Sequence, residues 1–473
     1  MLIVGYFNTF DKVKYGIYET KKFRKPIYAF TPFYFTKINN IIIKKIKLPY
    51  LGKMKGKLIA QVELLEENDF PLARIHTLIG SYSKDNIYNL LLANSEHKYK
   101  DLKLNKKDIV LEDYSSDFIT IDPKGSVDLD DGFNINFPYL DIIIAAPIFY
   151  VDEKDIMNKY LEGVSSRYGK KVNHLWGDLV TNKCSLLENN SIECLVVRYN
   201  LETKEFVVKF EKGKSRKQYS YEEYNEENLC NNVLKKYFDY DDSCEMVSEI
   251  MILCNRLLTR YCEENNLEMI YREFDYVEND LDVPKVFNYM RGEGAKYTKE
   301  KSDHKILGGR YGHFTSPLRR WVDIYNQMLI YNFVKREKDV KYDIDFGVLN
   351  YKFEKIKKFH IEYEMLNYNI DNEKKCDGVI YEVRESGKLI VYLLDEKKFV
   401  KVNIFHPKLR YQKIVDFDSD NRIWKIVDKI SGERMEFKYG KKINLMLKEN
   451  SSYLLPSEKI SGIIGVIGVI DIL

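Results

Sequence analysis

The stretch Thr120-Ile-Asp-Pro-Lys-Gly-Ser-Val-Asp-Leu-Asp-Asp-Gly132 places four aspartates within ten residues: Asp122, Asp128, Asp130 and Asp131. Ionised carboxylates this close repel one another and are costly to bury, so such a cluster is normally solvated or neutralised by a bound cation. Their hard oxygen atoms suit Mg²⁺ or Mn²⁺ better than zinc. We therefore interpret the acidic loop, residues 122–131, as a candidate site for Mg²⁺, with Mn²⁺ as a substitute ion.

The acidic loop has two alternative interpretations, a surface turn and a calcium-binding EF-hand loop. A surface turn is an open alternative, because Pro-Lys-Gly-Ser and Asp-Asp-Gly are common turn sequences. A calcium-binding EF-hand loop requires glycine at its sixth position and glutamate at its twelfth. A loop that starts at Asp128 has Phe133 and Tyr139 at these positions, so an EF-hand is excluded.

The size and composition of the chain indicate a multidomain globular protein. At 473 residues it exceeds what one hydrophobic core normally supports, and roughly two to four domains are expected. Its seven cysteines, an odd number without Cys-x-x-Cys spacing, favour the cytoplasm or another reducing compartment, with organellar or viral residence left open. The apolar run 460–473 contains three glycines and is shorter than the roughly 20 residues of a membrane helix. We expect a closing strand there and no membrane association.

One segment of the chain is strongly basic. Between Lys21 and Val62 there are ten lysines and Arg24 but no acidic residue, so this segment carries +11 while the whole chain carries +3. A concentrated basic region is typical of a polyanion-binding surface, with a solvated strand surface as the alternative. Aromatic residues such as Phe23 and Tyr28 lie among the lysines, as in surfaces that stack single-stranded bases. The RNA-binding candidates here are Lys44, Lys45 and Lys55.

Hydrophobic patterning predicts two small β-structures at the ends of the chain. Short apolar runs over residues 2–66, separated by polar or Pro/Gly breaks, have the rhythm of a small β-barrel. Runs at 379–383, 389–394 and 399–404 predict a second one. Helices are expected around 86–94 and, from apolar spacing, over 246–264.

The acidic loop is expected to sit between strands of a buried sheet. Residues 119–121 are predicted to be a strand and 123–126 a turn, followed by a hairpin of residues 133–137 and 142–148. A loop supported in this way is a rigid base for a functional site.

A second unusual stretch is His313-Phe-Thr-Ser-Pro-Leu-Arg-Arg-Trp-Val-Asp323. Its Ser316-Pro317 pair predicts the start of a helix with Arg319 and Arg320 in the first turn. Cations at a helix N-terminus are unfavourable by up to ~1 kcal/mol each unless an anion joins them. The guanidinium groups and free backbone N–H groups would thus bind a phosphate, with a salt bridge to Asp323 as the alternative.

Together, the two stretches resemble the catalytic (RNB) domain of the ribonuclease II family, which includes ribonuclease R. The resemblance extends over roughly residues 110–375. It implies a hydrolytic 3′-to-5′ exoribonuclease that degrades single-stranded RNA to nucleoside 5′-monophosphates by two-metal-ion catalysis. It also implies an α+β fold in which an RNB-type domain, a mixed sheet with helices, is flanked by small OB-like β-barrels. The expected domains are an OB or cold-shock-like barrel (1–70), a connecting region (71–110), the RNB domain (111–371) and a C-terminal OB-like barrel (372–473).

The resemblance also implies a role for each site residue. All four aspartates of the acidic loop would contact metal, and Asp130 would also position or deprotonate the attacking water. Arg319 would neutralise charge on the phosphoryl oxygens, and Arg320 would contact RNA. Tyr168 would lie near the RNA 3′ end and Tyr221 in the catalytic pocket, with ordinary core packing as the alternative for both tyrosines.

Other positions match or depart from the family pattern. Cys184-Ser-Leu186 matches a family element. Ser248 replaces a usual glutamate, Gln327 replaces a usual histidine, and only 27 residues separate Tyr221 from Glu249, fewer than in typical relatives. These differences concern the grip on substrate more than the chemistry.

Two alternative functions are compatible with these departures. One is a catalytically silent RNA-binding scaffold with an RNB fold, and the other is a magnesium-dependent nuclease that also acts on DNA. The expected partner is the 3′ end of single-stranded RNA. A helicase or another RNA-decay partner is left open, and a monomer is expected.

Overall fold

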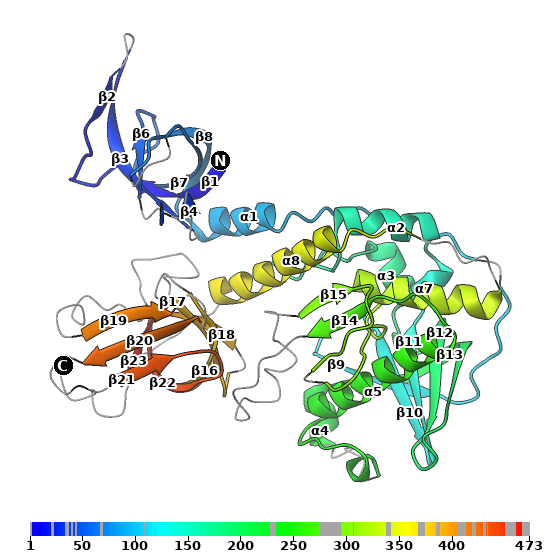
Figure 1. Ribbon diagram of the computed structural model, residues 1–473. Coiled ribbons are helices and arrows are strands. Elements are labelled where there is room, and N and C mark those ends of the chain that lie inside the picture. The colour runs from blue at the N-terminus through cyan, green and yellow to red at the C-terminus, as the bar shows by residue number, and fades with distance from the viewer. Residues whose placement is uncertain are drawn as a thin grey trace. The chain divides into compact units, whose positions relative to one another are not determined.

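The computed structural model describes residues 2–19, 23–33, 37–38, 41–42, 45–66, 70–107, 109–227, 233–274, 295–305, 307–336, 342–367, 374–384, 388–396, 398–403, 413–418, 422–428, 432, 434–449 and 460–465. The chain divides into two compact units. One consists of Ser95–Asn279 and Pro284–His360, and the other of Met1–Asn94, Asp280–Val283 and Ile361–Leu473. Both contain sheets and helices (Figure 1), which confirms the predicted α+β class.

The N-terminal residues form a six-stranded antiparallel sheet. Its strands are β1 (Leu2–Asn8), β2 (Ile17–Glu19), β3 (Arg24–Pro32), β6 (Ile46–Pro49), β7 (Lys57–Leu64) and β8 (Ala73–Ser81). Ile3, Gly5 and Phe7 of β1 are buried while Val4 and Tyr6 are less so, as expected for a strand with one face on a core. A bridge between Lys47 and Leu72 joins β6 to the residue before β8, so the sheet curves towards a barrel. β8 lies within residues 71–110, which were expected to form the connecting region.

Three further elements complete this part of the chain. The short strands β4 (Lys37–Ile38) and β5 (Ile41–Ile42) pair with each other. The helix predicted around residues 86–94 is confirmed as α1 (Lys84–Asn94).

The C-terminal residues form a five-stranded and a three-stranded sheet. The first has the order β18-β17-β16-β22-β23, with β16 (Lys374–Val383), β17 (Lys388–Leu393), β18 (Lys398–Asn403), β22 (Lys442–Glu449) and β23 (Ile460–Gly465). The second contains β19 (Lys413–Asp418), β20 (Ile423–Asp428) and β21 (Arg434–Phe437). The predicted closing strand is confirmed over the extent of β23, while residues 466–473 lie outside the described residues. Within the described part of the chain, no helix combines the length and the apolar character needed to cross a membrane.

The unit of Ser95–Asn279 and Pro284–His360, called the barrel unit below, is built on a closed five-stranded barrel. Its order is β10-β11-β12-β13-β9, with β9 (Phe118–Asp122), β10 (Asp131–Asn136), β11 (Tyr139–Ala145), β12 (Ser191–Asn200) and β13 (Phe206–Ser220). β10 and β11 form the predicted hairpin, and β13 runs parallel to β9. Leu140 to Ala145 are all buried, because one face of β11 lines the barrel and the other is covered. Burial on both faces explains why this segment is a continuous apolar run rather than an alternating one.

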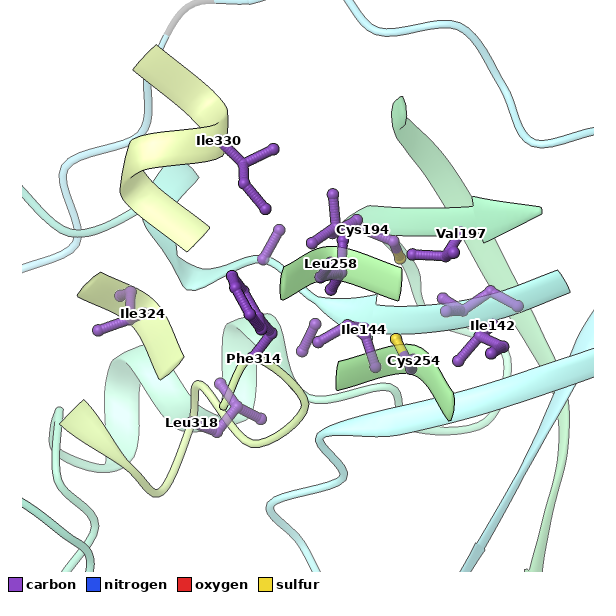
Figure 2. Packing of buried hydrophobic residues seen from close by; sticks show 14 of the residues in the cluster. Ile142, Ile144, Cys194, Val197, Cys254, Leu258, Phe314, Leu318, Ile324 and Ile330 are labelled. Atoms are coloured by element: carbon purple, nitrogen blue, oxygen red, sulfur yellow. The ribbon is translucent and has the colours of Figure 1, made fainter. Parts of the chain in front are cut away.

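Helices and a further hairpin follow or interrupt the barrel strands along the chain. They are α2 (Glu153–Glu162), α3 (Asp178–Cys184), α4 (Tyr221–Glu226), α5 (Ser243–Glu264), α7 (Trp321–Lys335) and α8 (Phe346–Asn367), with the short helices η1 (Pro147–Phe149) and η2 (Leu234–Lys236) and the hairpin β14 (Tyr271–Phe274) and β15 (Ala295–Thr298). Figure 2 shows Phe314 and Leu318 with Cys254 and Leu258 of α5, next to Ile144 of β11. The segment that carries the second motif is therefore anchored in the core of the barrel unit.

The predicted start of the arginine-bearing helix is wrong. α7 begins at Trp321, and Arg320 precedes it in an extended conformation. Residues 317–319 form a turn in which the Arg320 N–H donates to the Ser316 carbonyl at 2.9 Å. The segment is kept out of the helix because its backbone pairs with residues 164–166, where the Ser166 N–H donates to the Arg319 carbonyl at 2.9 Å. Arg319 and Arg320 thus precede the helix instead of occupying its first turn.

Candidate active site

The acidic loop connects β9 to β10, two neighbouring strands of the barrel. Asp122 is the last residue of β9 and Asp131 the first of β10. Ser185 fixes the middle of the loop, since its hydroxyl accepts from the Leu129 N–H at 2.9 Å. The Leu186 N–H donates to the Leu129 carbonyl at 3.1 Å. The carboxylates therefore come from a loop whose backbone is held by the barrel and by the Cys184-Ser-Leu186 element.

Asp130 joins the acidic loop to the second motif. Its Oδ1 accepts from the Leu318 N–H at 2.7 Å, and its Oδ2 lies 3.0 Å from the Arg319 Nε. The Asp130 side chain is 2% exposed, whereas that of Arg319 is 50% exposed. Arg319 thus neutralises a buried carboxylate while part of its surface stays open to a ligand.

The cluster has an excess of negative charge. Burial raises the pKa of Asp122 to about 7, and repulsion from Asp131 adds to the rise while Arg319 opposes it. Burial likewise raises the pKa of Asp131 to about 6, again opposed by Arg319. Burial also raises the pKa of Asp130, against the attraction of Arg319 and the hydrogen bond from Leu318. A single guanidinium does not fully compensate these carboxylates, which is the electrostatic setting that a divalent cation would relieve.

The donor chemistry of the loop fits Mg²⁺ or Mn²⁺. All candidate ligands are carboxylate oxygens, and Oδ2 of Asp122 is buried without a hydrogen-bond partner. Among the described residues, however, no three Asp, Glu, His or Cys side chains already stand in a metal-ligating arrangement. Side chains of the loop would therefore have to reorient to complete the coordination of an ion.

Tyr168 lies against the acidic loop. Its hydroxyl donates a hydrogen bond to Oδ2 of Asp128, and its backbone N–H donates to Nε2 of His360 at 3.1 Å. The Nδ1 of His174 is 3.9 Å from the same Asp128 oxygen. The predicted 3′-end tyrosine is thus brought to the carboxylates by contacts with residues far apart in the sequence.

Tyr221 lies near the first aspartate of the acidic loop. It begins α4 directly after Ser220, which is paired with Asp122 in the parallel β9–β13 ladder. Burial raises the pKa of Tyr221, and Asp131 and Asp122 contribute to the rise. The structure therefore places both predicted tyrosines beside the aspartates.

Arg320 forms a salt bridge with Asp323. Its Nε and Nη2 both donate to the Asp323 carboxylate, the latter at 2.8 Å. A salt bridge to Asp323 was the alternative to phosphate binding for both arginines. Among the described contacts, Arg320 forms this salt bridge and Arg319 does not. A quarter of its side chain is nevertheless exposed.

The predicted RNA-binding lysines belong to the N-terminal part of the chain. Lys45 and Lys55 are exposed, and Lys44 lies outside the described residues. Lys57 was not among the predicted RNA-binding lysines. Its Nζ lies 3.8 Å from the ring centroid of Tyr82 and 4.3 Å from that of Tyr6.

Sequence reasoning missed several residues that support the site. Ser185 lies in the Cys184-Ser-Leu186 tripeptide, so this motif is a local signal for its role. His360 and His174 had no local signal, because only folding brings them to Tyr168 and Asp128. Gln327 is buried in α7, and its amide donates to the Ala145 carbonyl at 2.9 Å while its Oε1 has no partner.

Comparison with known proteins gives a family match for the part of the chain that carries Tyr221, Arg319 and Arg320. Residues 217–336 match the family model of the RNB domain. The fold is similar to that of apo RNase R from Mycoplasma genitalium, with a TM-score of 0.65, 13% identity and coverage of 98% of this chain and 89% of that chain. The same enzyme in complex with ribose methylated single-stranded RNA gives a TM-score of 0.65 at 14% identity with the same coverage.

A further structural relative is not an active enzyme. Yeast Ssd1, a pseudonuclease, matches with a TM-score of 0.59 and 11% identity, covering 98% of this chain and 83% of that chain. No curated protein matches the sequence. The overall fold therefore does not by itself separate an active nuclease from an inactive one, and the site has to carry that distinction.

Proposed function

Because the chain is an RNB-domain protein with the fold of ribonuclease R, we propose that it is a hydrolytic 3′-to-5′ exoribonuclease of single-stranded RNA. The products are nucleoside 5′-monophosphates. The observation that carries the proposal is the convergence of the acidic loop on Arg319, through the 3.0 Å contact with Asp130. An inactive protein would have no need to keep the buried carboxylates of Asp122, Asp130 and Asp131, whose pKa values burial raises, together beside a partly exposed arginine.

The acidic loop is proposed to hold Mg²⁺ or Mn²⁺ through Asp122, Asp128, Asp130 and Asp131. Bound metal would supply the charge that stabilises the attacking and leaving oxygens. Burial raises the pKa values of Asp122 and Asp131, so the ionised forms of both carboxylates would gain from a cation.

Asp130 and Arg319 are proposed to act as a pair. Arg319 reaches a non-bridging oxygen of the scissile phosphate with the exposed part of its guanidinium. As the phosphate attracts Arg319, a carboxylate oxygen of Asp130 becomes able to orient the attacking water and accept its proton. The water oxygen bonds to phosphorus, the bond to the 3′ oxygen breaks, and that oxygen takes a proton from solvent. The shortened RNA and a nucleoside 5′-monophosphate result.

Tyr168 and Tyr221 are proposed to hold the terminal nucleotides beside the acidic loop. Both rings adjoin the aspartates, Tyr168 through Asp128 and Tyr221 through the position of Ser220 beside Asp122. Stacking of a base on such a ring contributes about 1–3 kcal/mol and tolerates any base. This fits an enzyme that removes nucleotides without sequence preference.

A catalytically silent RNA-binding scaffold is the second candidate. It is favoured by the direct Asp130–Arg319 ion pair and by the lack of a preformed metal-ligand set among the described residues. In that case Arg319 would permanently take the place of a metal ion in neutralising the carboxylates.

One assay separates these functions. The purified protein is incubated with 5′-labelled RNA and with DNA of the same sequence, with Mg²⁺ or with EDTA. A ladder that shortens from the 3′ end, on RNA alone and with Mg²⁺ alone, is expected. Tight binding without cleavage would establish the scaffold, and equal cleavage of DNA would establish a nuclease that does not read the 2′-hydroxyl.

A reducing intracellular compartment, such as the cytoplasm, is the proposed location. The six described cysteines are thiols, and five of them are buried. The proposal is supported by thiols that the fold keeps as small apolar residues.

A further inference from the structure

Arg272 carries a charge that the chemistry described above does not use. It lies in β14, directly opposite Tyr297 of β15. The neighbouring acid, Glu273, points to the other face of this hairpin, where it contacts Lys296 at 3.3 Å and Ser302 at 3.1 Å. The acid closest to Arg272 in sequence is therefore committed elsewhere.

The guanidinium of Arg272 rests on the face of Tyr297. Its carbon lies 4.5 Å from the ring centroid. The ring itself is fixed, since its hydroxyl is 2.8 Å from Nδ1 of His313 and its centroid is 4.7 Å from that of Phe353. Cation–π stacking on a fixed ring orients a guanidinium while leaving its N–H donors free to bind a ligand.

Positive charge predominates around Arg272. Burial lowers its pKa, and the nearby Arg320 lowers it further. Asp323, the closest acid to Arg320, is already bound by Arg320 and by the Ser316 N–H at 2.8 Å. Within the described part of the chain, no carboxylate makes an ion pair with Arg272. A partly buried guanidinium without a counter-ion is costly unless an anion joins it.

The positive charge around Arg272 lies near residues of the proposed catalytic centre. His313, whose Nδ1 is 2.8 Å from the Tyr297 hydroxyl, has a pKa that is lowered by burial and then by Arg320, Arg272, His304 and Arg319. Arg320 is adjacent in sequence to Arg319, which contacts the acidic loop. An anion at Arg272 and Arg320 would therefore lie close to a phosphate bound at Arg319.

We propose that Arg272, positioned by Tyr297, is a second phosphate-binding residue, and that with Arg320 it holds a backbone phosphate of the RNA strand next to the phosphate bound at Arg319. This inference rests on the proposed RNA substrate. It does not require hydrolysis, so its failure and that of the proposed function can be told apart.

The test measures binding of 3′-terminal 12-nucleotide RNAs to the full chain in EDTA, by fluorescence anisotropy over a range of salt concentrations. Arg272→Gln is expected to weaken binding roughly tenfold. It should also reduce the slope of log K against log salt by about 0.7, the value for one phosphate contact on a single strand. The loss should be the same for oligo(U) and oligo(A), because a phosphate carries no sequence.

Two further variants make the result specific. Arg260→Gln removes an exposed arginine of α5 that pairs with Glu264 at 2.7 Å, and it should change neither affinity nor slope. Arg272→Lys keeps the charge, so it should keep the salt slope while binding roughly threefold more weakly. Arg272→Lys also guards against misfolding of the glutamine variant, whose thermal transition is recorded in parallel.

Three outcomes would overturn the inference. The first is an unchanged affinity and slope in Arg272→Gln while the wild type binds and cleaves RNA, which would leave the proposed function intact. The second is a loss that depends on sequence, which would make Arg272 a base-reading residue. The third is an equal loss of binding to a nucleoside 5′-monophosphate, which would assign Arg272 to the terminal phosphate instead of a backbone phosphate.

Discussion

Nε of Arg319 lies 3.0 Å from Oδ2 of Asp130, although the two residues are 189 positions apart in the chain. The contact joins the two sequence motifs into one site. In the proposed mechanism Arg319 would have two partners, the buried carboxylate of Asp130 in the free protein and the phosphate in the complex. The following predictions test the electrostatics around this pair.

Asp130→Asn is expected to lower RNA hydrolysis by roughly 10²-fold or more while leaving RNA affinity within a few fold. The amide keeps the shape and can still accept from the Leu318 N–H, but it cannot take a proton from water. Hydrolysis is followed by release of 5′-monophosphates and binding by anisotropy in EDTA. Asp113→Asn, at an exposed aspartate outside the acidic loop, is the matched control. Undiminished Mg²⁺-dependent hydrolysis in Asp130→Asn would remove this residue from the catalytic role.

Arg319→Gln and Asp130→Asn are expected to be coupled in stability. Removing Arg319 alone leaves a buried carboxylate unpaired and should destabilise the barrel unit by about 3–5 kcal/mol. Adding Asp130→Asn in the same chain should restore much of this loss, giving a coupling energy of about 1–3 kcal/mol in the double-mutant cycle. Thermal unfolding in EDTA provides the measurement. Additive effects of the two substitutions would show that the pair does not interact in solution.

The acidic loop could be found from the sequence because its chemistry is local. Four carboxylates within ten residues have few structural explanations, and the backbone around them follows short-range strand and turn signals. The start of α7 could not be found in this way. Ser316-Pro317 has the composition of a helix start, but pairing with residues 164–166 and the carboxylates of Asp130 and Asp323 take up the backbone groups that would begin the helix.

The same limit applies to the partners of the site. The closure of the barrel depends on the parallel pairing of β9 with β13, which begins more than 80 residues later in the chain, and no local pattern encodes it. His360 and Arg272 look like ordinary residues of a helix and a strand until folding sets one beside Tyr168 and the other on Tyr297. The sequence therefore predicts which residues carry the chemistry of the acidic loop, but it does not predict which distant residues contact them.

Asp122 is expected to make stability depend on pH. Its pKa rises from 3.8 in the unfolded chain to about 7 in the folded protein. The folded protein thus retains a proton that the unfolded chain releases, and this contribution to stability is lost as pH rises from about 4 to about 7. Without metal, Asp122→Asn should melt roughly 2–6 °C above wild type at pH 8, and this difference in melting temperature should become smaller as the pH falls towards about 4.

The difference in melting temperature between Asp122→Asn and the wild type separates the effect of Asp122 from that of the histidines. Burial lowers the pKa of His97, His304 and His360 to about 4, so the unfolded chain binds more protons there and their contribution has the opposite sign. These histidines are present in both proteins and cancel in the comparison. A melting difference that is constant from pH 5 to pH 8 would contradict the raised pKa of Asp122.

Mg²⁺ is expected to raise the melting temperature of the wild type at pH 8. A ligand that binds only the folded state stabilises it by about 2.7 kcal/mol at a concentration 100 times its dissociation constant. The rise should be smaller at pH 5.5, where protons compete for Asp122 and Asp131, and absent in the double variant Asp122→Asn/Asp131→Asn. Asp113→Asn should respond like the wild type. An equal response of the double variant would place the ion elsewhere.

Gly132→Ala is expected to destabilise the barrel unit where the acidic loop enters β10. A Cβ at this position would lie 2.7 Å from the Ile119 carbonyl oxygen and 2.9 Å from the Phe118 ring. Both neighbours belong to β9, so backbone and a buried ring would have to move, at a cost of about 1–3 kcal/mol. Gly347→Ala in α8 is the matched control, because its Cβ would meet only the carboxylate of Asp345, the flexible end of a side chain.

Gly132→Ala should also reduce the Mg²⁺-induced rise in melting temperature, since the movement of β10 away from β9 would separate Asp131 from Asp122. A full response to Mg²⁺ in a destabilised Gly132→Ala protein would show that the close approach of β9 and β10 does not set the spacing of the carboxylates.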